Sequence, residues 1–125
     1  MSTPTSYRDL EVWQKSMKLA VAIYTMTAAF PKHELYGLTS QMRRAAVSVP
    51  ANIAEGRGRG YRGEFAHHAS IARGSVTELD TYLELALRLG YLDTHVVESP
   101  VQLADDVSRM LTMLIRALRR PQVKR

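Results

Sequence analysis

The feature that most constrains the fold is a helical pattern of apolar residues, which recurs along most of the chain. The pattern is clearest in segment 62–89. Its apolar residues follow one another there at spacings of three and four: Phe65, Ala69, Ala72, Val76, Leu79, Leu83 and Ala86. This spacing places them on one face of an α-helix and is typical of the seam between packed helices. Because strand signals are nearly absent, the sequence predicts an all-α protein.

Proline and glycine divide the pattern into four segments. Pro31 disfavours helical geometry in the residue before it, and Gly90 is suited to cap a helix in the left-handed conformation. A glycine-rich turn lies between them at 56–63. We therefore predict helices at about 9–29, 35–56, 62–89 and 94–119, with a basic tail at 120–125. Short connections between four amphipathic helices predict one domain, 1–125, folded as an antiparallel up-down-up-down four-helix bundle.

The first predicted helix has two rows of apolar residues. One row has the spacing of a bundle seam and comprises Leu10, Trp13, Met17, Ala20 and Tyr24. The other row lies about 100° around the helix axis and comprises Val12, Leu19, Ile23, Met26 and Phe30. A face of this width is expected to contact more than one neighbouring helix.

Two prolines lie inside the predicted helices. Pro50 removes one backbone donor and crowds the carbonyl of Ala46, so we expect a kink there, because helix-forming residues resume at once. Near Pro100 the sequence allows two starts for the fourth helix. Either Ser99 is its N-cap, or the helix begins at Thr94 and bends at Pro100.

Charge is spread unevenly along the chain, whose formal net charge is +5. Segment 31–75 has seven basic and three acidic residues (+4), and segment 116–125 has five basic residues and no acidic ones (+5). Segment 76–115 has two basic and seven acidic residues (−5). This asymmetry predicts either a polyanionic partner or self-association through opposite charges.

The composition also indicates a compartment. The chain has no cysteine, so it has no disulfide framework, which fits a reducing environment. The N-terminal residues lack the basic start and apolar run of a secretory signal, and no window approaches the roughly 20 apolar residues of a membrane span. A soluble cytoplasmic protein without a membrane partner is the resulting expectation.

Polar residues interrupt the apolar pattern of the second predicted helix. A comparable polar row on the third helix has Ser75, Glu78 and Tyr82. Facing rows of this kind predict a structural network that fixes helix register, inside the bundle or at a subunit contact. An arginine facing Glu78 is its most natural charged pair. The predicted members are Gln41, Arg43, Arg44, Asn52, Glu55 and Glu78.

Two basic segments are candidates for nucleic-acid binding. The glycine-rich turn offers Arg57, Arg59, Tyr61 and Arg62, where flexible glycines let arginines reach phosphates and a tyrosine can stack on a base. The second segment is the C-terminal one and comprises Arg116, Arg119, Arg120, Lys124 and Arg125. The alternative interpretations, a solvated turn for the first segment and a solubilising tail for the second, stay open.

Signals for an enzyme are weak. Glu64 and His67 form a Glu-x-x-His pattern on one helix face, but the di-iron bundles that use this pattern carry it twice. The chain has no second copy, no phosphate-binding loop after a strand, no serine nucleophile elbow and no cysteine nucleophile. We therefore expect no metal site, no cofactor and no enzymatic activity.

Four stretches of the chain resemble one known family: YRDLEVWQK, FPKHELYGLTSQMRRAAVSVPANIAEG, GSVTELDTYLELALRLGYL and SRMLTMLIRALRR. From about Tyr7 to Arg120 the chain is similar to the four-helix-bundle proteins encoded in intervening sequences of bacterial 23S ribosomal RNA genes. A related branch is the accessory variability protein of diversity-generating retroelements. The resemblance implies a left-handed bundle that assembles into a homopentamer with a basic surface. In the retroelement branch it implies association with a reverse transcriptase and nucleic acid.

The leading hypothesis from the sequence is a non-enzymatic, basic, oligomeric bundle that associates with RNA or DNA mainly through phosphates. The alternative is a structural or adaptor oligomer that binds an acidic protein partner, such as a reverse transcriptase, and has no direct nucleic-acid role.

Overall fold

The computed structural model describes residues 6–121, and throughout this range the chain is helical apart from short turns. Four long helices, α1 (Glu11–Thr27), α2 (Leu38–Gly58), α3 (Arg62–Arg88) and α4 (Thr94–Arg119), carry the fold. Two short 3₁₀ helices, η1 (Tyr7–Asp9) and η2 (Lys32–Glu34), precede α1 and α2. Since no strand occurs in the described range, the predicted all-α fold with four helices is confirmed.

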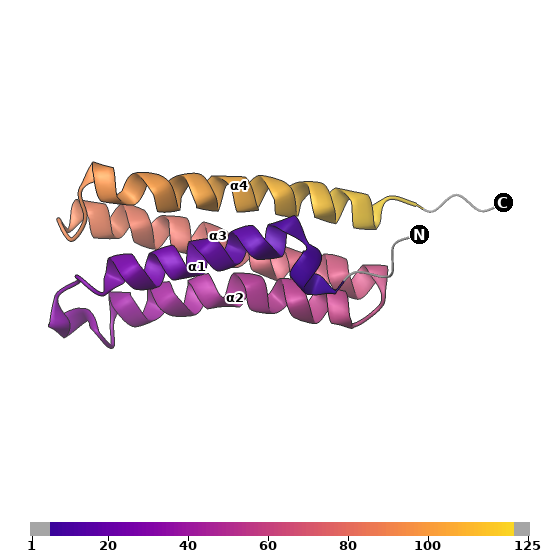
Figure 1. Ribbon diagram of the computed structural model, residues 1–125, viewed down its shortest axis with the longest axis horizontal. Helices are drawn as coiled ribbons and strands as arrows, with labels where there is room; N and C mark the ends of the chain where they lie inside the picture. The colour runs from indigo at the N-terminus through magenta and orange to yellow at the C-terminus, as the bar shows by residue number, and fades with distance from the viewer. Residues whose placement is uncertain (1–5, 122–125) are drawn as a thin grey trace.

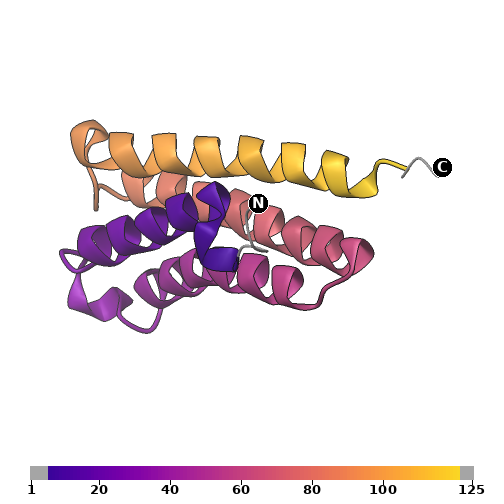
Figure 2. The same cartoon turned by 45° about the vertical axis from the view of Figure 1, so that its right-hand side comes forward.

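The four helices lie along a common long axis (Figure 1). Each helix contacts the next one in the chain, and α1 also contacts α4. The turn between α2 and α3 lies at one end of the molecule, together with the last turn of α4 (Figures 1 and 2). The other two connections lie at the opposite end. None of the helices within residues 6–121 is long and apolar enough to cross a membrane.

A single hydrophobic core runs between the helices. The predicted seam of α3 is buried from Ala69 to Ala86, while Phe65 at its start is only half-buried. All four helices contribute to the largest fully buried side chains, which include Leu19, Ile23, Met42, Ile53, Leu79, Leu83 and Leu111. The seam therefore continues through the whole length of the bundle.

Helix α1 buries only one of its two predicted apolar rows. The row from Val12 to Phe30 is buried throughout. In the other row Ala20 is buried, but Met17 is 39% exposed and Tyr24 is 45% exposed. The predicted contact with more than one neighbouring helix is confirmed, since α1 packs against both α2 and α4, although Met17 and Tyr24 stay partly exposed.

The predicted bounds of the first two helices are wrong by two or three residues. Helix α1 is shorter than 9–29 at both ends. Its N-terminal side is taken up by η1, which the Ser6 hydroxyl caps by accepting the N–H of Arg8 at 3.1 Å. Helix α2 starts three residues late and ends two residues late relative to 35–56, because η2 occupies the approach to its start. The bounds of α3 and α4 agree with the prediction to within one residue.

The ends of α3 and α4 are fixed by local capping. Gly90 has a φ of +78°, and the N–H of Tyr91 bonds to the carbonyl of Ala86 at 3.0 Å, which is the left-handed cap expected there. The Asp93 carboxylate accepts the N–H of Val96 at 2.9 Å and caps α4. Of the two predicted starts for this helix, Thr94 is therefore correct. The helix continues through a buried Pro100.

A candidate nucleic-acid interface at one end of the bundle

The structure brings the two predicted basic segments to the same end of the bundle. Arg62, the first residue of α3, donates from Nη2 to the carbonyl oxygen of Ala117 in α4 at 2.7 Å. The last carbonyls of a helix lack partners within the helix, so a cation there satisfies one of them and suits the helix dipole. This bond joins residues that are 55 positions apart.

An arginine-lined groove lies between α3 and α4 beside this contact. Its volume is about 530 Å³, and Thr112 and Ile115 complete its lining together with four arginines. No carboxylate lines the groove. The arginines are Arg73, Arg116, Arg119 and Arg120. Their charges therefore converge on one open surface, which we call the arginine groove.

Hydrogen bonds across the helix pair hold two of these arginines in place. Arg73 Nη1 lies 3.4 Å from Thr112 Oγ1, and Arg119 Nη2 lies 3.4 Å from Ser70 Oγ. Arg73 was missed by the sequence analysis. It directly follows the seam residue Ala72, so its place at the edge of the core was readable, but the identity of the facing helix was not.

A smaller pocket lies on the other side of the last turn of α4, against the α2–α3 turn. Its volume is about 160 Å³. Three of the four predicted turn residues line it: Arg57, Tyr61 and Arg62. Gly60 makes the turn possible, because its φ is +81°. The pocket is completed by Gly56, Phe65 and Leu118, and we call it the turn pocket.

Arg59 is oriented differently from the other turn arginines. Its Nη2 lies 2.7 Å from Glu55 Oε2, and its Nη1 lies 3.9 Å from Glu64 Oε1. The hydrogen bond from Arg59 lowers the pKa of Glu55 and raises the pKa of Arg59, so both groups stay charged. Two nearby carboxylates therefore offset the charge of Arg59.

Part of the predicted polar network links α2 to α3. The hydroxyls of Ser48 and Ser75 lie 2.9 Å apart. Asn52 Nδ2 donates to the Ser48 carbonyl at 2.9 Å, and Asn52 Oδ1 lies 3.1 Å from Nδ1 of His68. Glu55 does not join this chain, because it pairs with Arg59 at the surface.

The expected pair between an arginine of α2 and Glu78 is not formed by Arg43 or Arg44. Glu78 instead accepts a hydrogen bond from Tyr82 Oη at 3.0 Å, which raises the pKa of that tyrosine. Gln41, Arg44 and Glu78 line an open groove of about 380 Å³ between α2 and α3. These three side chains line the groove without a hydrogen bond or ion pair between them in the described part of the chain.

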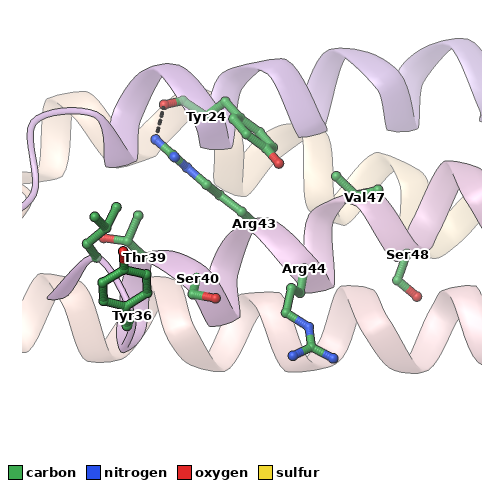
Figure 3. Close-up of a pocket in the computed structure, with 9 residues that line it drawn as sticks. Tyr24, Tyr36, Thr39, Ser40, Arg43, Arg44, Val47 and Ser48 are labelled. Atoms are coloured by element: carbon green, nitrogen blue, oxygen red, sulfur yellow. Dashed lines mark hydrogen bonds between the residues drawn. The ribbon is translucent and has the colours of Figure 1, made fainter.

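Arg43 fastens the start of α2 to the end of α1. Its Nε donates to Thr27 Oγ1 at 2.9 Å, and its Nη2 lies 3.4 Å from the carbonyl oxygen of Tyr24 (Figure 3). Its guanidinium also lies 4.6 Å from the centre of the Tyr24 ring. These contacts fasten the half-buried Arg43 side chain to α1 and leave it little freedom to reach a ligand.

A third surface feature is a groove of about 560 Å³ between α1 and α2, which the sequence analysis did not predict (Figure 3). Tyr36 is 93% exposed there. Arg44 makes no hydrogen bond or ion pair within the described part of the chain. The side chains that give the groove its character are Tyr24, Leu35, Tyr36, Arg43, Arg44 and Val47. We call it the α1–α2 groove.

The remaining candidates do not gather into a site. Glu64 lies near Arg59, and the ring of His67 contacts the ring of His68 with centroids 5.5 Å apart. Within residues 6–121, no group of three or more histidine, aspartate or glutamate side chains is arranged to hold a metal ion. Lys124 and Arg125 of the basic tail lie outside the described residues.

Comparison with known proteins identifies the family. Residues 8–113 match the 23S rRNA-intervening sequence protein family. The chain belongs to this family. The match covers α1, α2, α3 and most of α4, and it ends before the arginines of the last turn. Comparison with curated proteins gives no match.

A solved structure shares the family fold. It is described as a protein with unknown function from the S23 ribosomal protein family of Bacteroides thetaiotaomicron. The two chains are 25% identical and superpose with a TM-score of 0.77. The similarity covers 84% of this chain and 95% of the other. Family membership thus agrees with the helical architecture, while neither description names a known enzyme class.

Proposed function

We propose that this chain is a non-enzymatic nucleic-acid-binding protein. In this proposal it is an antiparallel up-down-up-down four-helix bundle that assembles into a homo-oligomer, with a pentamer as the expected form. It binds RNA or DNA mainly through phosphates. The observation that carries the proposal is the arginine groove, where Arg73, Arg116, Arg119 and Arg120 meet on a surface lined by no carboxylate.

The distribution of charge over the bundle supports this proposal. All seven acidic residues of segment 76–115 fall between positions 78 and 106, so none lies in the last part of α4, 107–119, which lines the arginine groove. Positive charge gathers at the α2–α3 end of the bundle (Figure 1), where Arg62 joins the turn to α4. A field of this shape steers a polyanion toward one end of the molecule. In an oligomer the positive ends of several copies add to the same field.

The test is the salt dependence of binding to mixed-sequence RNA. We expect binding to weaken steeply as salt rises, because counterions are released when arginines neutralise phosphates. Replacing Arg116, Arg119 and Arg120 together by serine should reduce the slope of log K against log salt by about two to three. Each neutralised phosphate contributes about 0.7–0.9 to that slope.

Arg88→Ser provides the matched control. Arg88 lies at the far end of α3 and pairs with Glu84 at 2.9 Å, so its loss should leave the slope unchanged. Absence of binding even at low salt contradicts the proposed function. An equal change of slope in the control variant contradicts the assignment to the arginine groove.

A second function, a structural or adaptor role, is favoured by the α1–α2 groove. Exposed apolar side chains that border a cation without a partner mark a protein-contact surface. An acidic protein is the partner that suits Arg44, and a reverse transcriptase is the expectation carried over from the resemblance. This role predicts that one defined protein co-purifies after nuclease treatment and is lost on Val47→Glu, while the pure chain binds little RNA.

A further inference from the structure

We infer that the turn pocket holds an unpaired nucleobase, so that the partner is single-stranded nucleic acid. This inference rests on the proposed function and names the substrate class for the same end of the bundle. It is carried by an exposed aromatic ring, by the apolar side chains of the pocket beside it and by two arginines that line the same pocket.

The lining of the turn pocket suits a base with its phosphate. Gly56, Phe65 and Leu118 form an apolar surface, and Arg57 and Arg62 line the same pocket. A nucleobase has apolar faces, while the phosphate attached to its sugar carries the charge. Aromatic side chains within a positively charged groove are the combination that single-strand-binding proteins use.

Tyr61 presents a ring that the fold does not use for packing. The side chain is 73% exposed and has no aromatic partner within residues 6–121. Its hydroxyl makes no hydrogen bond there, and it does not cap α3, although Tyr61 is the N-cap residue. Phe65 follows one helical turn later and lines the same pocket, so the two rings border one space.

The turn pocket and the arginine groove both border the last turn of α4. Leu118 lines the pocket, and its neighbour Arg119 lines the groove. The bond from Arg62 to Ala117 holds the two surfaces together. A strand whose phosphates follow the arginine groove therefore reaches the turn pocket with the next nucleotides.

Only an unpaired base can use such a pocket. In a duplex the faces of the bases are covered by their neighbours, and the protein meets edges and phosphates. A single strand lets a base turn out of its stack and lie against an aromatic ring, which strengthens binding whatever the identity of the base. The geometry therefore favours single strands over duplexes without demanding a particular sequence.

The test compares two strands of equal length and charge. One is a short oligothymidylate, and the other is made entirely of abasic sites, so it keeps the phosphates and lacks the bases. At one low salt concentration, fluorescence anisotropy should show the natural chain binding the thymidylate at least about fivefold more tightly. Tyr61→Ala should lower thymidylate binding to the abasic level and leave abasic binding unchanged. Tyr61→Phe keeps the ring and should keep the preference.

Two results would overturn the inference. One is equal binding of the two strands by the natural chain, and the other is an equal loss for both strands in Tyr61→Ala. If either result accompanies a steep salt dependence with mixed-sequence RNA, the proposed function stands and only the base pocket falls. If no strand binds at any salt concentration, both fall. A strand carrying 2-aminopurine gives a second readout, since its fluorescence should be quenched by Tyr61 but not by alanine.

Discussion

At the scale of single residues, Gly56 shows how tightly the α2–α3 end is packed. A Cβ atom built on Gly56 would lie 2.7 Å from the Cβ of His68 and 3.2 Å from the Cα of Phe65. Any larger residue must push α3 away from α2. Gly74, in the middle of α3, meets nothing within 4 Å of the same ideal position. Close helix packing therefore requires a glycine at position 56 but not at position 74, although both lie in helices.

Gly56→Ala should destabilise the protein by about 1–3 kcal/mol, the usual cost of overpacking. Gly74→Ala should instead stabilise it by about 0.5–1 kcal/mol, because alanine loses less backbone entropy in a helix. Urea unfolding followed by circular dichroism measures both changes. A Gly56→Ala protein as stable as the natural chain would show that the helices have room to separate there.

At the scale of elements, one carboxylate fastens two connections to each other. Glu34 Oε1 accepts the N–H of Leu38 at 3.0 Å, and Glu34 Oε2 accepts the hydroxyl of Tyr91 at 2.8 Å. The first bond caps α2, whose N-cap residue Gly37 has no side chain to do so. The second reaches the α3–α4 connection. The Leu38 N–H and then the Tyr91 hydroxyl hold the pKa of Glu34 below its usual range.

This depressed pKa makes a prediction about acid stability. The ionised form of Glu34 is favoured in the folded chain, so its stabilising effect is complete above the ordinary glutamate pKa of about 4.3. The effect is lost as pH falls through the lower, folded-state pKa. Glu34→Gln should therefore be less stable than the natural chain at neutral pH, and the difference should shrink on acidification below about pH 4. Urea midpoints over a pH series measure the difference, with exposed Glu98→Gln as the control. A difference independent of pH would contradict the assignment.

The contacts at the helix ends show which helix bounds can be predicted from the sequence. Gly90 and Asp93 cap α3 and α4 through bonds to residues at most five positions away, so those bounds were readable. The start of α2 was not, because Glu34 is held by Tyr91, which is 57 positions away. The pairing of Arg59 with Glu55 was readable in principle, since a spacing of four places the two side chains on one helix face.

For the candidate site, too, the local features could be predicted from the sequence and the tertiary contacts could not. Its arginines and Tyr61 were found as two separate basic segments, because charge and glycine content are local properties. Their union depends on the bond from Arg62 to Ala117 and on the packing of Arg73 against α4, both of which are tertiary. The exposed apolar groove between α1 and α2 was missed for a related reason. Tyr24 belongs to an apolar row, and only the packed bundle shows which members of that row stay outside.

At the scale of the whole molecule, two complementary surfaces lie on different helix pairs. A groove of about 320 Å³ between α3 and α4 is both acidic and apolar, with Asp80, Glu84 and Asp105 beside Val97 and Val101. Partial burial and the nearby charge of Asp105 raise the pKa of Asp80, so this carboxyl is already crowded by negative charge. The α1–α2 groove offers the opposite charge at Arg44, again beside apolar side chains. Contacts between unlike surfaces of identical copies lead to rings when the rotation closes.

The last prediction concerns this assembly. If copies join through the two grooves, the natural chain should sediment at a multiple of its 14.1 kDa monomer mass. Arg44→Glu should then shift the population toward the monomer, because a carboxylate there repels the acidic groove of the next copy. Lys18→Glu makes the same change in net charge on an exposed position of α1 and should leave the mass unchanged. Circular dichroism should show native helicity in both variants, since Arg44 is exposed and holds no other described residue.

A monomeric natural chain, or an unchanged mass for Arg44→Glu, would contradict an oligomer contact through these two grooves. A partial shift that weakens at higher salt, where the repulsion is screened, would identify the charge pair as one part of a contact that its apolar side chains complete.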